Sequence, residues 1–110
     1  MRYYRLIGKL PYPCRDALEW ADWFLTADRQ VAKTAVGPLS VSTVFLGFDH
    51  NLNLRGDPIL FETMIFGDGD VGEECYQDRY HSWEEAVAGH ARAVAHAEQI
   101  VAKANLLLIN

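Results

Sequence analysis

Two apolar segments with the composition of β-strands flank a polar loop in the middle of the chain, and this block constrains the fold more than any other feature. The segments are residues 41–48 and 59–66, and the loop between them is rich in Asn, Gly, Asp and Pro. Ten loop residues are too many for a tight hairpin turn, and loops of this length often carry function. The sequence therefore predicts two long strands with a candidate site in the loop that joins them.

The N-terminal third predicts a strand, a helix and a second strand. Residues 3–7 are rich in strand-forming types, and Pro11 and Pro13 then indicate a turn. Residues 14–27 carry apolar side chains at three- and four-residue spacing, which is typical of an amphipathic helix. Residues 31–36 alternate small apolar and polar side chains, so we expect a short strand there.

The clearest helix follows an acidic, glycine-rich stretch, residues 67–78, which predicts a surface loop. Ser82 and Glu85 have the spacing of a capping box, in which each side chain accepts a hydrogen bond from a backbone N–H at the start of the helix. The apolar tail, residues 106–109, either extends the core or contacts another subunit. The predicted inward stripe of the helix consists of Trp83, Val87, His90, Val94, Ala97, Val101 and Ala104.

This order of elements predicts an α+β fold, with a small antiparallel sheet of about four strands and two helices in the order β-α-β-β-β-α. We expect the long C-terminal helix to pack on the sheet. The 110 residues, half of them hydrophobic, predict a single domain over residues 1–110 that can bury a core without metals or disulfides.

The composition excludes some classes of function. The formal charge of −5 argues against a general nucleic-acid or anionic-membrane binder, but it leaves room for a local basic pocket. Cys14 and Cys75 form neither a disulfide framework nor a zinc motif. Because the sequence shows no signal-peptide core and no apolar run of membrane-spanning length, we expect a protein of a reducing cytoplasm. We expect no cofactor.

Glu62 lies within an otherwise apolar strand, where an acid is costly to bury unless other groups satisfy it. The structural interpretation is a carboxylate paired with an arginine or with backbone N–H groups. The functional interpretation is a ligand contact, a general base or a metal ligand. His90, on the inward stripe of the last helix, is a candidate partner for Glu62, and a contact between them would fix both side chains.

Asp49 and His50 open the long loop at the end of a strand. An aspartate there either forms an Asx turn or a cap, or contributes to binding a hard cation or a polar ligand. The His50 ring is harder to explain by turn chemistry, so it favours a ligand contact.

Basic and aromatic residues in and near the loops suggest an anion pocket, because guanidinium groups bind phosphate and aromatic rings stack on bases. The candidate cations are Arg29, Lys33, Arg55 and Arg79. The candidate rings are Trp23, Phe48, Tyr76 and Tyr80.

The chain carries no HExxH, GxSxG or phosphate-loop motif that would indicate a known catalytic site. The acidic run at residues 66–74 lacks the ligand spacing of an EF-hand loop, so it predicts a solvated surface instead. Whether the chain is an enzyme therefore stays open, and the sequence favours a protein that binds without catalysis.

Residues 42–50, 58–67 and 79–90 match the patterns STVxLGxDH, PxxFETMxFG and RYxTWEEAxxGH. On these three motifs, residues 29–95 resemble a group of small uncharacterised proteins of tailed phages and prophages. The loop differs from that pattern, with Asn-Leu-Asn-Leu instead of a Gly-Phe-Gly-like segment, and Ser82 replaces the usual threonine. The resemblance implies an accessory phage protein of the bacterial cytoplasm and, by analogy, an inhibitor of host defence that sequesters a nucleotide signal. The matching residues are Ser42-Thr43-Val44, Leu46-Gly47, Asp49-His50, Pro58, Phe61-Glu62-Thr63-Met64, Phe66-Gly67, Arg79-Tyr80, Trp83-Glu84-Glu85-Ala86 and Gly89-His90.

Three classes of function remain open. The first is a non-catalytic module, expected to be a homo-oligomer, that binds a small anionic or nucleotide-like ligand. The second is a metal-dependent hydrolase that uses Asp49, His50, Glu62 and His90. The third is a phage–host protein-interaction module without a small ligand. The predicted ligand-binding residues are Asp49, His50, Glu62, Arg79, Tyr80 and His90.

Overall fold

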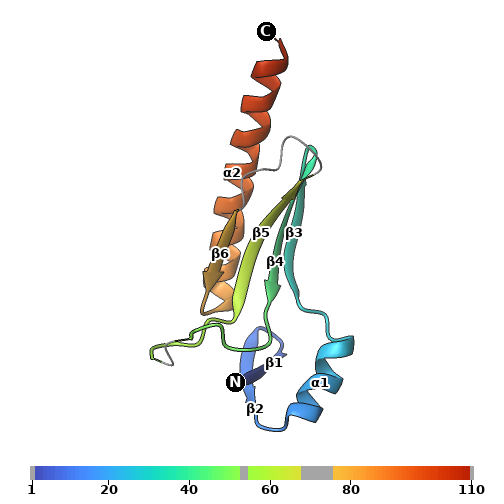
Figure 1. Ribbon diagram of the computed structural model, residues 1–110, viewed down its shortest axis with the longest axis vertical. Coiled ribbons are helices and arrows are strands. Elements are labelled where there is room, and N and C mark those ends of the chain that lie inside the picture. Colours follow the sequence, from blue (N-terminus) through green and yellow to red (C-terminus); the bar gives the residue numbers. More distant parts are fainter. Residues whose placement is uncertain (1, 53–54, 68–75, 110) are drawn as a thin grey trace.

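The computed structural model describes residues 2–52, 55–67 and 76–109, and it confirms the α+β class. Figure 1 shows one long helix lying along one face of a four-stranded sheet, with a small hairpin and a short helix at the far end from the C-terminus. The elements are β1 (Tyr3–Ile7), β2 (Leu10–Cys14), α1 (Ala17–Thr26), β3 (Gln30–Val36), β4 (Leu39–Phe45), β5 (Phe61–Gly67), β6 (Gln77–Tyr80) and α2 (Trp83–Ile109).

The main sheet is antiparallel, with its strands in the order β3-β4-β5-β6. A two-residue turn joins β3 to β4, and Gly37 in this turn has a φ of +56°, a conformation that favours glycine. The last strand differs from the prediction, which extended a surface loop to residue 78. Residues 68–75 of that loop lie outside the described residues, but Gln77–Tyr80 forms an edge strand on β5. Its polar composition is not typical of strands, which explains the difference.

β1 and β2 form a separate two-stranded hairpin, where the sequence predicted a strand followed by a turn. The prediction was wrong at β2 because prolines disfavour strands, yet Pro11 and Pro13 occupy alternate positions, opposite Leu6 and Tyr4. At alternate positions of an antiparallel pair the N–H groups point away from the partner strand, so a proline there removes no bond between the strands. The N–H of Tyr4 accordingly points away from β2 and donates to the Gly47 carbonyl at 2.8 Å.

The core lies between the main sheet and α2. Alternate residues of β4 and of the first half of β5 face the helix and are buried, whereas their neighbours face away and are partly exposed. This alternation is the period of two that strands impose on side chains. The fully buried strand residues include Val41, Thr43, Phe45, Phe61 and Thr63.

The inward stripe of α2 is made of small residues, so the helix lies close to the sheet. Gly89 marks the closest approach, because a methyl group on its Cα would lie 2.2 Å from the ring of Tyr80. Val87, which we expected in the stripe, is 48% exposed because the stripe is centred on the alanines beside it. Ala86, Ala93 and Ala97 are fully buried.

The N-terminus of α2 has the predicted Ser82 and Glu85 cap, with the Glu85 bond reaching one residue before Ser82. The Ser82 hydroxyl accepts a hydrogen bond from the Glu85 N–H at 3.1 Å, and the Glu85 carboxylate accepts one from the His81 N–H at 3.2 Å. The reciprocal bonds fix where the helix begins, which places His90 two turns later against the sheet.

Candidate functional site

The six predicted ligand-binding residues lie in three separate places, not in one site. Asp49 and His50 lie in the segment after β4, where the β1–β2 hairpin joins the main sheet. Glu62 and Arg79 lie on the sheet face that points away from α2. The remaining two, Tyr80 and His90, are buried between the sheet and α2.

His90 belongs to a chain of hydrogen bonds that we call the interior network. Its Nδ1 lies 2.7 Å from the Thr43 hydroxyl, and its Nε2 lies 2.9 Å from the Thr34 hydroxyl. The Thr43 hydroxyl also lies 2.5 Å from that of Thr63, which accepts a hydrogen bond from the Tyr80 hydroxyl at 3.0 Å. The network thus joins α2 to β3, β4, β5 and β6.

Two assignments of protons satisfy every bond in the interior network with a neutral His90, and in both of them Tyr80 donates to Thr63. In the first, Thr63 donates to Thr43, Thr43 donates to Nδ1, and Nε2–H donates to Thr34. In the second, Thr43 donates to Thr63, Nδ1–H donates to Thr43, and Thr34 donates to Nε2. Burial lowers the pKa of His90, which favours the neutral ring. Burial also raises the pKa of Tyr80, although the bond to Thr63 opposes the shift, so the phenol stays protonated. With His90 neutral and Tyr80 protonated, the hydrogen bonds of the network connect α2 to the sheet and are structural contacts.

The expected contact between Glu62 and His90 is wrong. Glu62 accepts hydrogen bonds from Arg79 Nε at 2.8 Å and from Gln77 Nε2 at 2.9 Å, both from the neighbouring strand β6. The register places Glu62 directly opposite Arg79, and strand alternation turns both away from the helix that carries His90. The environment of Glu62 therefore matches the structural interpretation, a carboxylate paired with an arginine.

Asp49 connects three segments of the chain where the β1–β2 hairpin meets the main sheet, a place that we call the junction. Its side chain is only 2% exposed; Oδ1 accepts the N–H groups of Asn51 and Ile59, and Oδ2 accepts a hydrogen bond from Arg2 at 2.5 Å. Burial by itself would raise the pKa of Asp49, but these backbone donors and the Arg2 guanidinium together lower it below its usual range. Asp49 is thus an ionised structural residue that forms the predicted Asx turn.

His50 also has local partners. Its ring stacks on Phe48 with the centroids 4.3 Å apart, its Nδ1 lies 3.0 Å from the Phe48 carbonyl oxygen, and its backbone N–H donates to Ile59. The ring is thereby held at the junction, beside the aromatic cluster of α1 and β1.

The other expected cations do not form one anion pocket. Arg29 donates to the Phe45 carbonyl oxygen at 3.0 Å, and its guanidinium lies 4.0 Å from the centre of the Phe24 ring. Arg79 is paired with Glu62. Lys33 is exposed on the edge strand β3, and Arg55 is exposed in the loop before β5.

The sequence reasoning missed a concavity of about 340 Å³ at the open end of the β1–β2 hairpin. Within the described part of the chain, Arg15 has no hydrogen bond or ion pair, and Arg2 uses one terminal nitrogen for Asp49 and keeps its other donors. A signal was available: the first 15 residues contain four bases and no acid. This N-terminal concavity is lined by Arg2, Tyr3, Tyr4, Pro13, Cys14 and Arg15.

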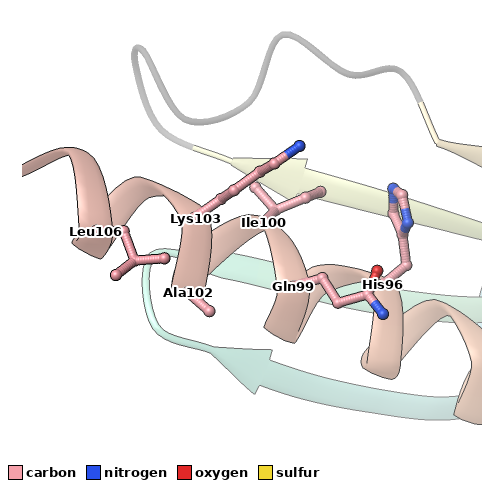
Figure 2. Close-up of a pocket in the computed structure, with 6 residues that line it drawn as sticks. All are labelled: His96, Gln99, Ile100, Ala102, Lys103 and Leu106. Carbon is pink, nitrogen blue, oxygen red and sulfur yellow. The ribbon is translucent and has the colours of Figure 1, made fainter.

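A second concavity, the α2 groove, has a volume of about 400 Å³ and runs along the C-terminal half of α2. Figure 2 shows its mixed lining, with the polar side chains of His96, Gln99 and Lys103 beside the apolar Ile100 and Leu106. It contains none of the six predicted residues.

The described residues contain no group of three or more His, Cys, Asp or Glu side chains placed to bind a metal ion. The four residues of the predicted hydrolase lie in the three places described above. Neither described helix is long and apolar enough to cross a membrane. Comparisons with protein-family models, curated proteins and solved structures found no match to this chain.

Proposed function

We propose that this protein is a non-catalytic binding module whose N-terminal concavity holds a small anionic or nucleotide-like ligand. The observation that carries the proposal is a pair of arginines, Arg2 and Arg15, at a concavity that also presents the aromatic residues Tyr3 and Tyr4. Guanidinium groups bind phosphate through several donors at once, and aromatic rings supply stacking surface for a base.

The charge distribution supports this location. The first 15 residues carry four bases without an acid, which leaves six bases and fifteen acids for the other 95 residues. An anion therefore meets a local excess of basic residues at the hairpin, although Asp49 already compensates the charge of Arg2, and an excess of acids over the rest of the chain. Arg2 is already oriented by Asp49, so less side-chain entropy is lost when it binds a ligand.

The resemblance to phage and prophage proteins supports a biological setting for such a module. We place it as a phage accessory protein in the bacterial cytoplasm, expected to be a homo-oligomer, where sequestering a nucleotide signal would inhibit a host defence system. The absence of a shared site for Asp49, His50, Glu62 and His90 gives the hydrolase alternative less support.

Isothermal titration calorimetry with inorganic phosphate, mononucleotides and cyclic dinucleotides tests the ligand class. Arg15→Ala removes an unpaired guanidinium without disturbing the fold, and it should weaken binding about 10- to 100-fold. Arg92→Ala is the matched control, since it removes the same charge from an exposed position on α2 and should leave binding unchanged. No binding by any probe, or equal loss in both variants, would overturn the proposal.

The interaction module without a small ligand remains a second candidate because α1 exposes apolar residues. Leu18 and Leu25 are 79% and 81% exposed, and no residue of α1 is fully buried. A host protein that docks on α1 would be lost from a pull-down with Leu18→Lys/Leu25→Lys and kept with Arg15→Ala. Capture that the leucine substitutions do not affect would contradict docking on α1.

A further inference from the structure

Opposite charges are segregated between the first two parts of the chain. Residues 1–15, which include the β1–β2 hairpin, carry four bases and no acid, whereas residues 16–28, which include α1, carry four acids and no base. Of these eight charged side chains only Arg2 has an ion pair, to Asp49, within residues 2–52, 55–67 and 76–109. The other seven charges are therefore available for ion pairs with another molecule.

The hairpin also exposes apolar side chains beside its bases. The register sets Arg5 opposite Tyr12 and Ile7 opposite Leu10, so these four side chains lie on one face of the hairpin. Ile7, Leu10 and Tyr12 are 52%, 60% and 43% exposed, whereas Leu6 on the opposite face packs against the core. We call Arg5, Ile7, Leu10 and Tyr12 the hairpin face.

The outer side of α1 has the complementary character. Leu18, Asp22 and Leu25 follow one another at four- and three-residue spacing, so they lie on one side of the helix, and Glu19 is exposed beside them. Trp20 lies on the other side of the helix and contacts β1. We call Leu18, Glu19, Asp22 and Leu25 the α1 face.

These two faces suit each other better than other exposed parts of the chain. The hairpin face requires a partner with apolar and acidic side chains, which the α1 face supplies. The exposed leucines near the end of α2 offer no such match, because residues 104–109 carry no charge. A partner cannot add a strand to β2 either, because the residues whose backbone points outward are Pro11 and Pro13, which have no N–H.

The arrangement of the two faces favours a second copy as the partner. Figure 1 shows the hairpin and α1 side by side at one end of the molecule, so one partner can reach both. A two-fold contact requires a surface that is complementary to itself as a whole. A surface that combines an apolar basic face with an apolar acidic face meets this requirement.

We propose that this protein forms a two-fold dimer in which the hairpin face of each copy packs against the α1 face of the other. Each copy carries a charge of −5, and the contact sets the bases of one copy against the acids of the other, which offsets their repulsion. Residues 5–12 and 18–25 of each copy supply the contact, somewhat fewer than the roughly 20–30 residues per side of a standard interface. We therefore expect a dissociation constant on the order of 10 micromolar.

The dimer does not depend on the proposed ligand. The N-terminal concavity lies at the open end of the hairpin, and its arginines, Arg2 and Arg15, belong to neither face. Loss of the dimer and loss of ligand binding can therefore be measured separately.

Sedimentation velocity across a dilution series tests the contact through two charge reversals. At about 100 micromolar the wild-type chain should approach twice the mass of the 12.4 kDa monomer. Arg5→Glu and Asp22→Lys should each be monomeric with an unchanged circular dichroism spectrum, because each sets like charges against each other in both contacts. An equimolar mixture of these two variants should recover the dimer, since opposite charges then meet in both contacts.

Lys33→Glu is the matched control. It reverses an exposed base on β3 and changes the net charge by the same amount as Arg5→Glu, so it should leave the dimer intact. Arg5→Glu keeps Arg2 and Arg15, and its titration with phosphate or mononucleotides should match that of the wild type.

Three results would overturn the proposal. The first is a wild-type monomer at every concentration, which is also the result expected if α1 binds only a host protein. The second is a mixture of the two charge-reversal variants that stays monomeric, and the third is a Lys33→Glu variant that dissociates as far as Arg5→Glu does. Failure of every ligand to bind would overturn the proposed function and leave the dimer unaffected.

Discussion

The interior network and the N-terminal concavity both gather polar and aromatic side chains, but they differ in how far their hydrogen-bonding groups are already used. In the interior network His90 and Thr43 have protein partners on each side. At the concavity Arg15 has none among the described residues, and there is open volume beside it. The difference teaches that the bonds of the buried histidine are already used within the fold, whereas the concavity keeps donors that the proposed ligand would use.

The largest effect should come from Gly89→Ala, at the edge of the interior network. Alanine favours a helix over glycine by about 1 kcal/mol, but its methyl group would lie 2.2 Å from the Tyr80 ring. We expect the free energy of unfolding in urea to fall by about 3 kcal/mol as the ring is displaced. Gly8→Ala, with no atom within 4 Å, should cost only the strain of its positive φ, about 1 kcal/mol. A more stable Gly89→Ala variant would contradict the close packing.

The next effect concerns the pH dependence of stability. Burial lowers the pKa of His90 from its usual 6.5, so the unfolded chain binds a proton more readily than the folded chain does. The contribution of His90 is therefore complete above pH 6.5 and is lost progressively as the pH falls from there toward the lower folded-state pKa. Urea denaturation of the wild type across this window should show the loss.

His90→Gln is the control for that pH dependence. It should cost about 2 kcal/mol at pH 8 through imperfect bonds to Thr34 and Thr43, and it should remove the slope below pH 6.5. An unchanged slope in this variant would assign the pH dependence to another group.

A smaller effect is expected at the junction beside the concavity. Asp49→Asn keeps an acceptor for Asn51 and Ile59 but loses the ion pair to Arg2, so we expect a cost of about 1 to 2 kcal/mol. Hydrogen exchange at the Tyr4 N–H should accelerate, because the hairpin is joined to the main sheet there. Asp57→Asn, at an exposed loop position, should change neither measurement.

The smallest effect is expected for Glu62→Gln. The Glu62 side chain is only 12% exposed, but that of its partner Arg79 is 41% exposed, so solvent partly screens the pair and the cost should be about 1 kcal/mol. A loss of several kcal/mol in urea denaturation would show that Glu62 acts as a buried charge. It would also show that the sheet face pointing away from α2 contributes to stability as strongly as the interior network does.

The sequence predicted most elements because their local patterns are strong. The alternation of β4 and β5, the spacing in α1 and the Ser82–Glu85 box all depend on neighbouring residues. The strands β2 and β6 were missed because edge positions tolerate prolines and charges that a central strand does not.

The candidate site was harder to predict because it depends on contacts between distant residues. Composition marked Glu62 and His90 as unusual, but their partners come from β6 and from β3 and β4. The predicted pairing of Glu62 with His90 is wrong because the two side chains lie on opposite faces of the sheet. Glu62 points away from α2, the helix that carries His90.

By itself, the sequence determined the α+β class, the two helices, the long strands of the central block and the acid-free N-terminal stretch. Each of these features depends on residues that are close together in the chain. Only the tertiary structure decided that Asp49 joins the hairpin to the sheet, that His90 bonds threonines, and that Arg2 and Arg15 share one concavity. The physical reason is that the register of the strands and the packing of the helix determine which side chains can form hydrogen bonds with each other. Register and packing bring together residues that are far apart in the chain.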